Sequence, residues 1–136
     1  MKRIIGTALL VLSLAATGWA QAPAAKDDKV KQAMERASRD YVQSGLILAT
    51  EGRYEQAVKS FQKALEQDPQ NAEALSLLGS TYAKVGKYRE AEEALRKAVA
   101  LKPGYTEGYY FLGLFLQDQG KKQEADEAFR KARGGR

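Results

Sequence analysis

Residues 72–105 read AEALSLLGSTYAKVGKYREAEEALRKAVALKPGY, and the same pattern recurs on both sides at an interval of 34 residues. Small residues mark the interval in four sets: Gly45, Gly79 and Gly113; Gly52, Gly86 and Gly120; Ala57, Ala91 and Ala125; Ala64, Ala98 and Ala132. A fixed period of this size indicates stacked repeats, because a single unit cannot bury its own apolar face.

Each repeat is predicted to form two helices. In the central unit, apolar residues step by three and four positions, as on one face of a helix: Leu75, Leu78, Tyr82 and Val85, then Tyr88, Ala91, Leu95 and Ala98. Gly86 ends the first helix, because glycine takes the left-handed cap conformation without steric cost. Pro103 ends the second, since it has no amide proton. We therefore expect no strands and six helices, over Ser38–Thr50, Tyr54–Gln67, Ala72–Val85, Tyr88–Leu101, Thr106–Gln119 and Lys122–Ala132.

This pattern resembles the tetratricopeptide repeat (TPR), which has a large residue, Leu-Gly, Tyr, Ala, Phe or Leu, Ala and Pro at fixed offsets. Residues 72–105 match it completely, with Leu75, Leu78-Gly79, Tyr82, Ala91, Leu95, Ala98 and Pro103. Residues 38–71 supply Tyr41, Ser44-Gly45, Leu48, Ala57, Phe61, Ala64 and Pro69. Residues 106–136 supply Tyr109, Leu112-Gly113, Leu116, Ala125, Phe129 and Ala132, without the proline. The resemblance implies an all-α fold, a right-handed superhelix of three helix-turn-helix repeats.

The composition limits the chemistry that the chain can perform. It has no cysteine and no histidine, which excludes thiolate nucleophiles, disulfides, His-dependent triads and nearly all transition-metal sites. The remaining enzyme candidates are the carboxylate pairs Asp27-Asp28 and Glu92-Glu93, but neighbouring residues on a helix point in different directions. We therefore predict a protein that is not an enzyme and has no cofactor or metal.

Residues 1–20 have the pattern of a secretory signal. Lys2 and Arg3 precede an apolar run, residues 4–16, and Gly18-Trp19-Ala20 places small residues at both positions that a signal peptidase recognises. An uncleaved membrane anchor is the alternative, although the run is shorter than the ~20 residues that span a bilayer. We predict cleavage after Ala20, a mature chain that starts at Gln21, and a periplasmic or secreted protein with no integral membrane segment.

Residues 21–37 are predicted to be a leader followed by a helical extension of the first repeat. Gln21 to Lys26 has the composition of a flexible leader, and Asp27 or Asp28 is suited to cap the helix that follows. Val30, Met34 and Ala37 then fall on one face, which favours one long helix running into the first repeat. A mobile extension is the alternative.

The third repeat is predicted to be truncated and to leave an apolar face open. Lys122 stands where the other repeats have Tyr54 and Tyr88, whereas Phe129 and Ala132 stay apolar. This end is a candidate contact surface for another copy of the chain or for another protein. Its basic residues, Arg130, Lys131, Arg133 and Arg136, favour a solvated helix end. A phosphate-binding tail is the alternative, but we predict no nucleic-acid partner.

The TPR resemblance also implies a ligand groove lined by the first helix of each pair. The corresponding positions are Arg39, Val42, Leu46, Glu73, Ser76, Leu77, Ser80, Lys84, Glu107, Tyr110, Phe111 and Leu114. Some family members clamp a peptide's terminal carboxylate with Lys, Asn and Arg at five offsets, which here carry Val42, Leu46, Leu77, Glu107 and Phe111. No clamp residue is present, so binding of chaperone C-terminal tails is disfavoured.

These observations predict a protein–protein interaction module of the cell envelope, which binds a peptide or helix in the groove and assists complex assembly. Tyr110 is the best candidate anchor, because an aromatic side chain gives a large contact area at low entropic cost. The alternative is a self-assembling unit, a homo-oligomer formed through the helix pair of residues 106–136, with Phe129 at the contact.

Overall fold

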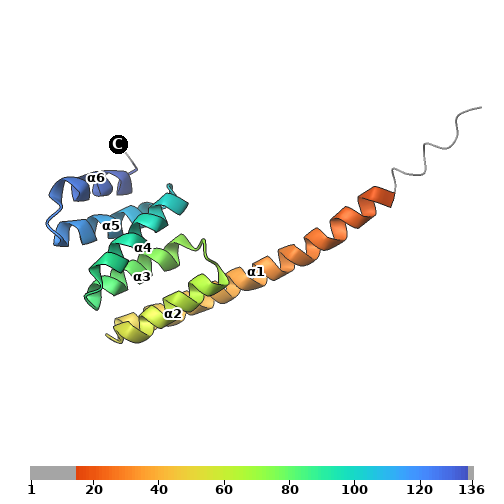
Figure 1. The fold of residues 1–136 in the computed structure, drawn as a ribbon, viewed down its shortest axis with the longest axis horizontal. Helices are drawn as coiled ribbons and strands as arrows, with labels where there is room; N and C mark the ends of the chain where they lie inside the picture. Colours follow the sequence, from red (N-terminus) through yellow and green to blue (C-terminus); the bar gives the residue numbers. More distant parts are fainter. Residues whose placement is uncertain (1–14, 135–136) are drawn as a thin grey trace, which may run out of the picture. The chain divides into compact units, whose positions relative to one another are not determined.

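The computed structural model describes residues 15–134 of the chain, and their side chains from residue 25 onward. Within these residues it has six helices and no strand (Figure 1). The helices are α1 (Ala15–Thr50), α2 (Tyr54–Gln67), α3 (Ala72–Lys84), α4 (Tyr88–Leu101), α5 (Thr106–Asp118) and α6 (Lys122–Ala132). The predicted all-α repeat fold is confirmed. The bounds of α2, α4 and α6 are those predicted, while α3 and α5 each end one residue earlier.

The chain divides between Met34 and Glu35 into two units. The described part of the first unit is the N-terminal portion of α1. The predicted leader and the predicted cap at Asp27 or Asp28 are wrong, because α1 begins at Ala15 and runs through both. Four alanines among residues 20–25 favour the helix, which carries Pro23 with the loss of one backbone hydrogen bond.

The predicted signal segment, residues 1–20, lies mostly outside the described residues. In the described range, 15–134, none of the helices combines the length and the apolar composition needed to cross a bilayer.

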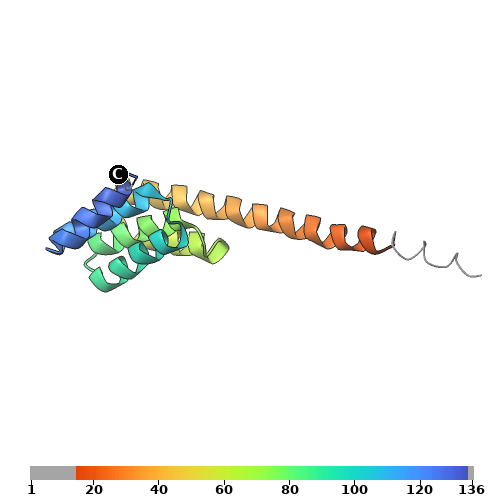
Figure 2. The ribbon, with the colours of Figure 1, turned by 90° about the horizontal axis from the view of Figure 1, so that it is seen from above.

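The second unit contains the three helix pairs, and each pair turns at a glycine. Gly52, Gly86 and Gly120 have φ angles of 75°, 80° and 77°. After each glycine a backbone amide donates to a carbonyl five residues back, at 2.9 Å: Arg53 to Leu48, Lys87 to Tyr82 and Lys121 to Leu116. These bonds satisfy carbonyl groups that the helix end leaves without partners. The repeated glycines therefore give three pairs with the same turn, one after another along the chain (Figure 2).

A second set of glycines lets the two helices of each pair approach closely. A Cβ placed on Gly79 would lie 2.6 Å from Leu95 Cγ and 3.0 Å from the carbonyl oxygen of Ala91. Gly45 meets Phe61 in the same way, and Gly113 meets Phe129. The predicted close approach of the helices is confirmed.

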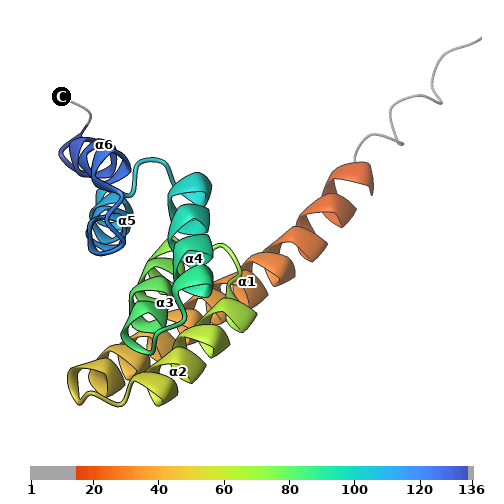
Figure 3. The same cartoon turned by 60° about the vertical axis from the view of Figure 1, so that its left-hand side comes forward.

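The core of the second unit continues from one repeat to the next. One buried cluster joins the first pair to α3, and a second joins α4 to α5 and α6, with Tyr82 packed against both. A polar contact adds to the first junction: Ser38 Oγ donates to the carbonyl oxygen of Ala64 at 2.8 Å, and Asn71 Nδ2 donates to Ser38 Oγ at 2.9 Å. In Figure 3, α3 lies between α2 and α4, and α5 packs beside α4. No repeat buries its apolar residues alone.

Candidate protein-interaction surface

The twelve predicted groove residues lie on α1, α3 and α5, and they differ in exposure. Val42 and Ser76 are buried and offer no surface to a partner. Leu77, Ser80 and Phe111 are half-buried. The other seven are exposed: Arg39, Leu46, Glu73, Lys84, Glu107, Tyr110 and Leu114. Because α3 and α5 pack against each other, their accessible residues lie on adjacent helices.

The accessible residues combine leucine and phenylalanine with charge. Leu46 and Leu114 are exposed large apolar side chains, and Leu77 and Phe111 are half-buried. We call these four residues, with the flanking charges Arg39, Glu73, Lys84 and Glu107, the first-helix surface. An apolar centre with a charged rim is the composition expected of a peptide-binding surface.

Two of the rim charges, Glu73 and Glu107, act on the same side chain, that of Tyr105. Burial, and then the nearby carboxylates of Glu73 and Glu107, raise the pKa of Tyr105 to about 12. Both carboxylates therefore act on one phenol, although they come from successive repeats.

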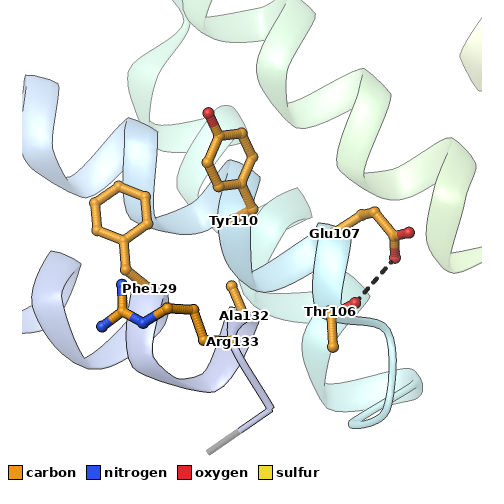
Figure 4. Close-up of a pocket in the computed structure, with 6 residues that line it drawn as sticks. All are labelled: Thr106, Glu107, Tyr110, Phe129, Ala132 and Arg133. Carbon is orange, nitrogen blue, oxygen red and sulfur yellow. Dashed lines mark hydrogen bonds between the residues drawn. The ribbon is translucent and has the colours of Figure 1, made fainter.

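A cleft of about 350 Å³ lies between α5 and α6. It is lined by Thr106, Glu107, Tyr110, Phe129, Ala132 and Arg133 (Figure 4). The ring centroids of Tyr110 and Phe129 are 5.9 Å apart. The prediction that Tyr110 and Phe129 belong to separate surfaces is wrong, because they line one cleft.

The 34-residue period explains why Tyr110 is accessible. Tyr110 is 51% exposed, whereas the residues at the same repeat position, Val42 and Ser76, are 5% and 0% exposed. Val42 packs in one buried cluster with Ala74 and Leu78 of the repeat that follows it. Tyr110 therefore belongs to the face that each repeat turns toward the next.

A second cleft, of about 370 Å³, lies beside α1 and was not predicted. It is lined by Asp40, Gln43, Ser44, Ile47, Leu48, Glu51 and Arg53. Ile47 is 54% exposed, but Thr81 and Phe115, at the same repeat position, are 5% and 6% exposed. This cleft therefore marks the face that each repeat turns toward the one before it. The sequence carries no signal for this cleft, because Ile47 is distinguished from Thr81 and Phe115 only by its exposure in the fold.

The carboxylates considered as catalytic candidates have no buried acid–base arrangement. Asp27 and Asp28 are exposed. Glu92 accepts hydrogen bonds from Arg96 at 2.7 Å and from Lys121 at 3.0 Å, and Arg96 also donates to Glu124 at 2.7 Å. The hydrogen bond from Arg96 is the main cause that lowers the pKa of Glu92. These contacts hold α4 to the start of α6. In the described part of the chain, no cluster of acidic side chains is arranged to hold a metal ion.

Three family models match the chain, all of them tetratricopeptide repeats. A TPR repeat model matches residues 45–86, and two tetratricopeptide repeat models match residues 72–105 and 106–132. Together they span residues 45–132, well over half of the sequence. The chain belongs to the tetratricopeptide-repeat family and, with it, to the class of protein–protein interaction modules.

Solved structures of other TPR proteins are similar to this chain. The second TPR of Spaghetti (RPAP3), bound to the HSP90 peptide SRMEEVD, is 25% identical, with a TM-score of 0.69 over 76% of this chain and 95% of that one. PilF of Pseudomonas aeruginosa is 31% identical, with a TM-score of 0.71 over 74% of this chain. MamA is 28% identical, with a TM-score of 0.63 over 71% of this chain. The chain spans only 45% of the PilF structure and 56% of the MamA structure. No curated protein sequence matches the chain.

Proposed function

We propose that this protein is a non-catalytic interaction module of the cell envelope, which binds a peptide or helix of a partner on the first-helix surface and assists assembly of a complex. The observation that carries this proposal is the group Leu46, Leu77, Phe111 and Leu114, which is accessible between charged residues on three successive first helices. Apolar side chains of a partner would displace water from these residues, while the flanking charges would set its orientation.

The similar RPAP3 structure supports a peptide as the ligand, since it holds an HSP90 peptide. This chain requires another peptide chemistry. The five positions of the family's carboxylate clamp carry four apolar residues and Glu107, and Val42 is buried. A terminal carboxylate would find no cation there. We therefore propose an internal segment with apolar anchors as the ligand.

The cell-envelope part of the proposal rests on the sequence pattern of residues 1–20. N-terminal sequencing of the protein recovered from a fractionated culture tests it, with a mature chain starting at Gln21 as the expected result. Recovery from the envelope of a species that still carries Trp19 would instead indicate an anchored protein.

Partner capture from envelope extracts tests the binding surface. The wild-type chain is crosslinked in the extract, and the proteins recovered with it are identified and compared with those recovered by Leu46→Asp/Leu114→Asp. Leu101→Asp is a matched control, because Leu101 is 41% exposed, against 38% and 37% for Leu46 and Leu114, and lies on α4 away from the first-helix surface. We expect the double variant to lose the partner that the control retains. Equal capture by all three folded proteins would refute the proposed site.

A further inference from the structure

The two clefts lie on the two end faces of the repeat stack. We call the cleft that contains Tyr110 and Phe129 the C-terminal face, and the cleft that contains Ile47 and Leu48 the N-terminal face. The corresponding positions inside the stack are filled by the adjacent repeat. The equivalents of Tyr110 and Phe129 in the second repeat, Ser76 and Leu95, are both fully buried. Each end face is therefore one half of a junction that the chain already forms within itself.

The junction between the second and third repeats shows which residues meet. A Cβ placed on Gly108 would lie 3.3 Å from Val99 Cγ1, so these two positions are in contact. Lys121 Nζ lies 3.0 Å from Glu92 Oε2 across the same junction. Glu73 and Glu107 both lie near Tyr105, as its raised pKa indicates. Each of these three pairs of positions has one member in the second repeat and one in the third.

The same three pairs can be traced to the two end faces through the period. One period after the second repeat, the C-terminal side carries Arg133, Asp126 and Glu107 in place of Val99, Glu92 and Glu73. Two periods before the third repeat, the N-terminal side carries Asp40, Arg53 and Arg39 in place of Gly108, Lys121 and Glu107. These three pairs join opposite charges, Arg133 with Asp40, Asp126 with Arg53, and Glu107 with Arg39, whereas the Arg96–Glu124 ion pair of the same junction maps to Arg130 and the neutral Gln56. The pair Asp126 and Arg53 repeats the internal ion pair of Glu92 and Lys121.

We propose that a second copy of this chain docks its N-terminal face on the C-terminal face of the first, as if it were the next repeat of the same stack. Tyr110 and Phe129 of one copy cover Ile47 and Leu48 of the other. The phenol of Tyr110 also brings a hydroxyl group to a face that contains Gln43 and Ser44. The three charged pairs surround this contact and fix its direction. The contact is heterologous, so a dimer keeps one free face of each kind and the assembly extends head to tail.

Sedimentation velocity of the full chain over a range of concentrations tests this inference. We expect the wild-type mass to rise with concentration beyond a dimer. Tyr110→Asp and Ile47→Asp each remove one face, and each should weaken self-association by about tenfold or more. A mixture of these two variants should form a 1:1 dimer and nothing larger, because only one intact junction is possible. Leu101→Asp, outside both faces, should assemble like the wild type.

Charge exchange tests the register of the contact. Arg133→Glu and Asp40→Lys should each weaken assembly, and the chain carrying both changes should recover it, because the pair is restored with its signs reversed. These positions are exposed, so circular dichroism should show all variants folded.

Several results would overturn the inference. The first is a wild-type chain that stays monomeric at every concentration. The second is an Ile47→Asp variant that assembles normally while Tyr110→Asp does not, since this would show a two-fold contact between C-terminal faces. The third is assembly unchanged by every variant, which would show a contact made elsewhere. The capture test changes Leu46 and Leu114, whereas the assembly tests change Tyr110, Ile47, Arg133 and Asp40, so either proposal can fail alone.

Discussion

At the scale of single residues, Gly79 sets the distance between α3 and α4. Any side chain there would meet Leu95 and the Ala91 carbonyl within 3.0 Å. We expect Gly79→Leu to lower the free energy of unfolding by ~1–3 kcal/mol, as overpacking does. Urea denaturation measures this. Gly104→Ala is the control, since a Cβ on Gly104 has no neighbour within 4 Å. Equal stability of Gly79→Leu and the wild type would contradict the close approach.

Tyr105 gives the stability of the protein a dependence on high pH. Its pKa is raised to about 12 from 10.0, so the folded state holds the phenol proton more tightly than the unfolded state does. The stabilisation is complete below pH 10 and is lost as the pH rises toward 12. We expect the melting temperature to fall over this window, and to fall less in Tyr105→Phe, which has no proton to lose. Parallel curves for the two proteins would show that Tyr105 is not the titrating group.

The residues at the clamp positions predict which peptide fails to bind. We expect the HSP90 peptide SRMEEVD, bound in the RPAP3 structure, to show no saturable binding to this chain in fluorescence anisotropy. The reason is that Leu46, Leu77 and Phe111 offer no cation to its terminal carboxylate, and Glu107 would repel it. Binding that is lost when the peptide's C-terminus is amidated would show that another cation performs this role.

At the scale of helices, the ion pairs of Glu92 connect α4 to the start of α6. We expect a double-mutant cycle of Glu92→Gln and Lys121→Ala to give a coupling of ~0.5–1 kcal/mol in the free energy of unfolding, because both groups are partly exposed. The coupling should shrink in high salt. Folding lowers the pKa of Glu92 from its ordinary value of 4.5. The contribution of Glu92 to the free energy of unfolding is therefore complete above pH 4.5, and it is lost as the pH falls through the lower pKa of the folded state. Additive single effects would mean that the pair contributes nothing to the junction.

The helix bounds were predictable because local chemistry sets them. Gly52, Gly86 and Gly120 end helices through their own backbone conformation, and this requires no knowledge of neighbours. The start of α1 was missed because Pro23 and the acidic pair after it are typical of a helix start, whereas the helix continues through them. Local signals of this kind cannot reveal whether a helix continues past a tolerated proline.

The candidate surface was only partly predictable, since exposure depends on which neighbours are present. The period identifies Val42, Ser76 and Tyr110 as equivalent, yet two of them are buried and the third is open. The N-terminal face was missed because most of its residues, such as Gln43 and Ser44, are polar and match no apolar pattern. Burial of the equivalent residues had to be seen before Ile47 stood out.

At the scale of the whole molecule, the repeats divide binding between different surfaces. The first-helix surface crosses all three repeats, whereas each end face belongs to a single repeat. The apolar residues of the first-helix surface differ from those of the end faces, whereas the charges Arg39 and Glu107 belong to both kinds of surface. The second helices, α2 and α4, have no part in either proposal except through Arg53, which precedes α2.

The central claim, that a partner binds on the first-helix surface, is tested most directly by mapping backbone amide chemical shifts. The captured partner segment is titrated into the isotope-labelled chain. We predict shift changes at Leu46, Leu77, Phe111 and Leu114, with saturation at one segment per chain and no change around Tyr88 and Leu101. Shift changes centred on α2 and α4, with the first-helix amides unmoved, would contradict the account.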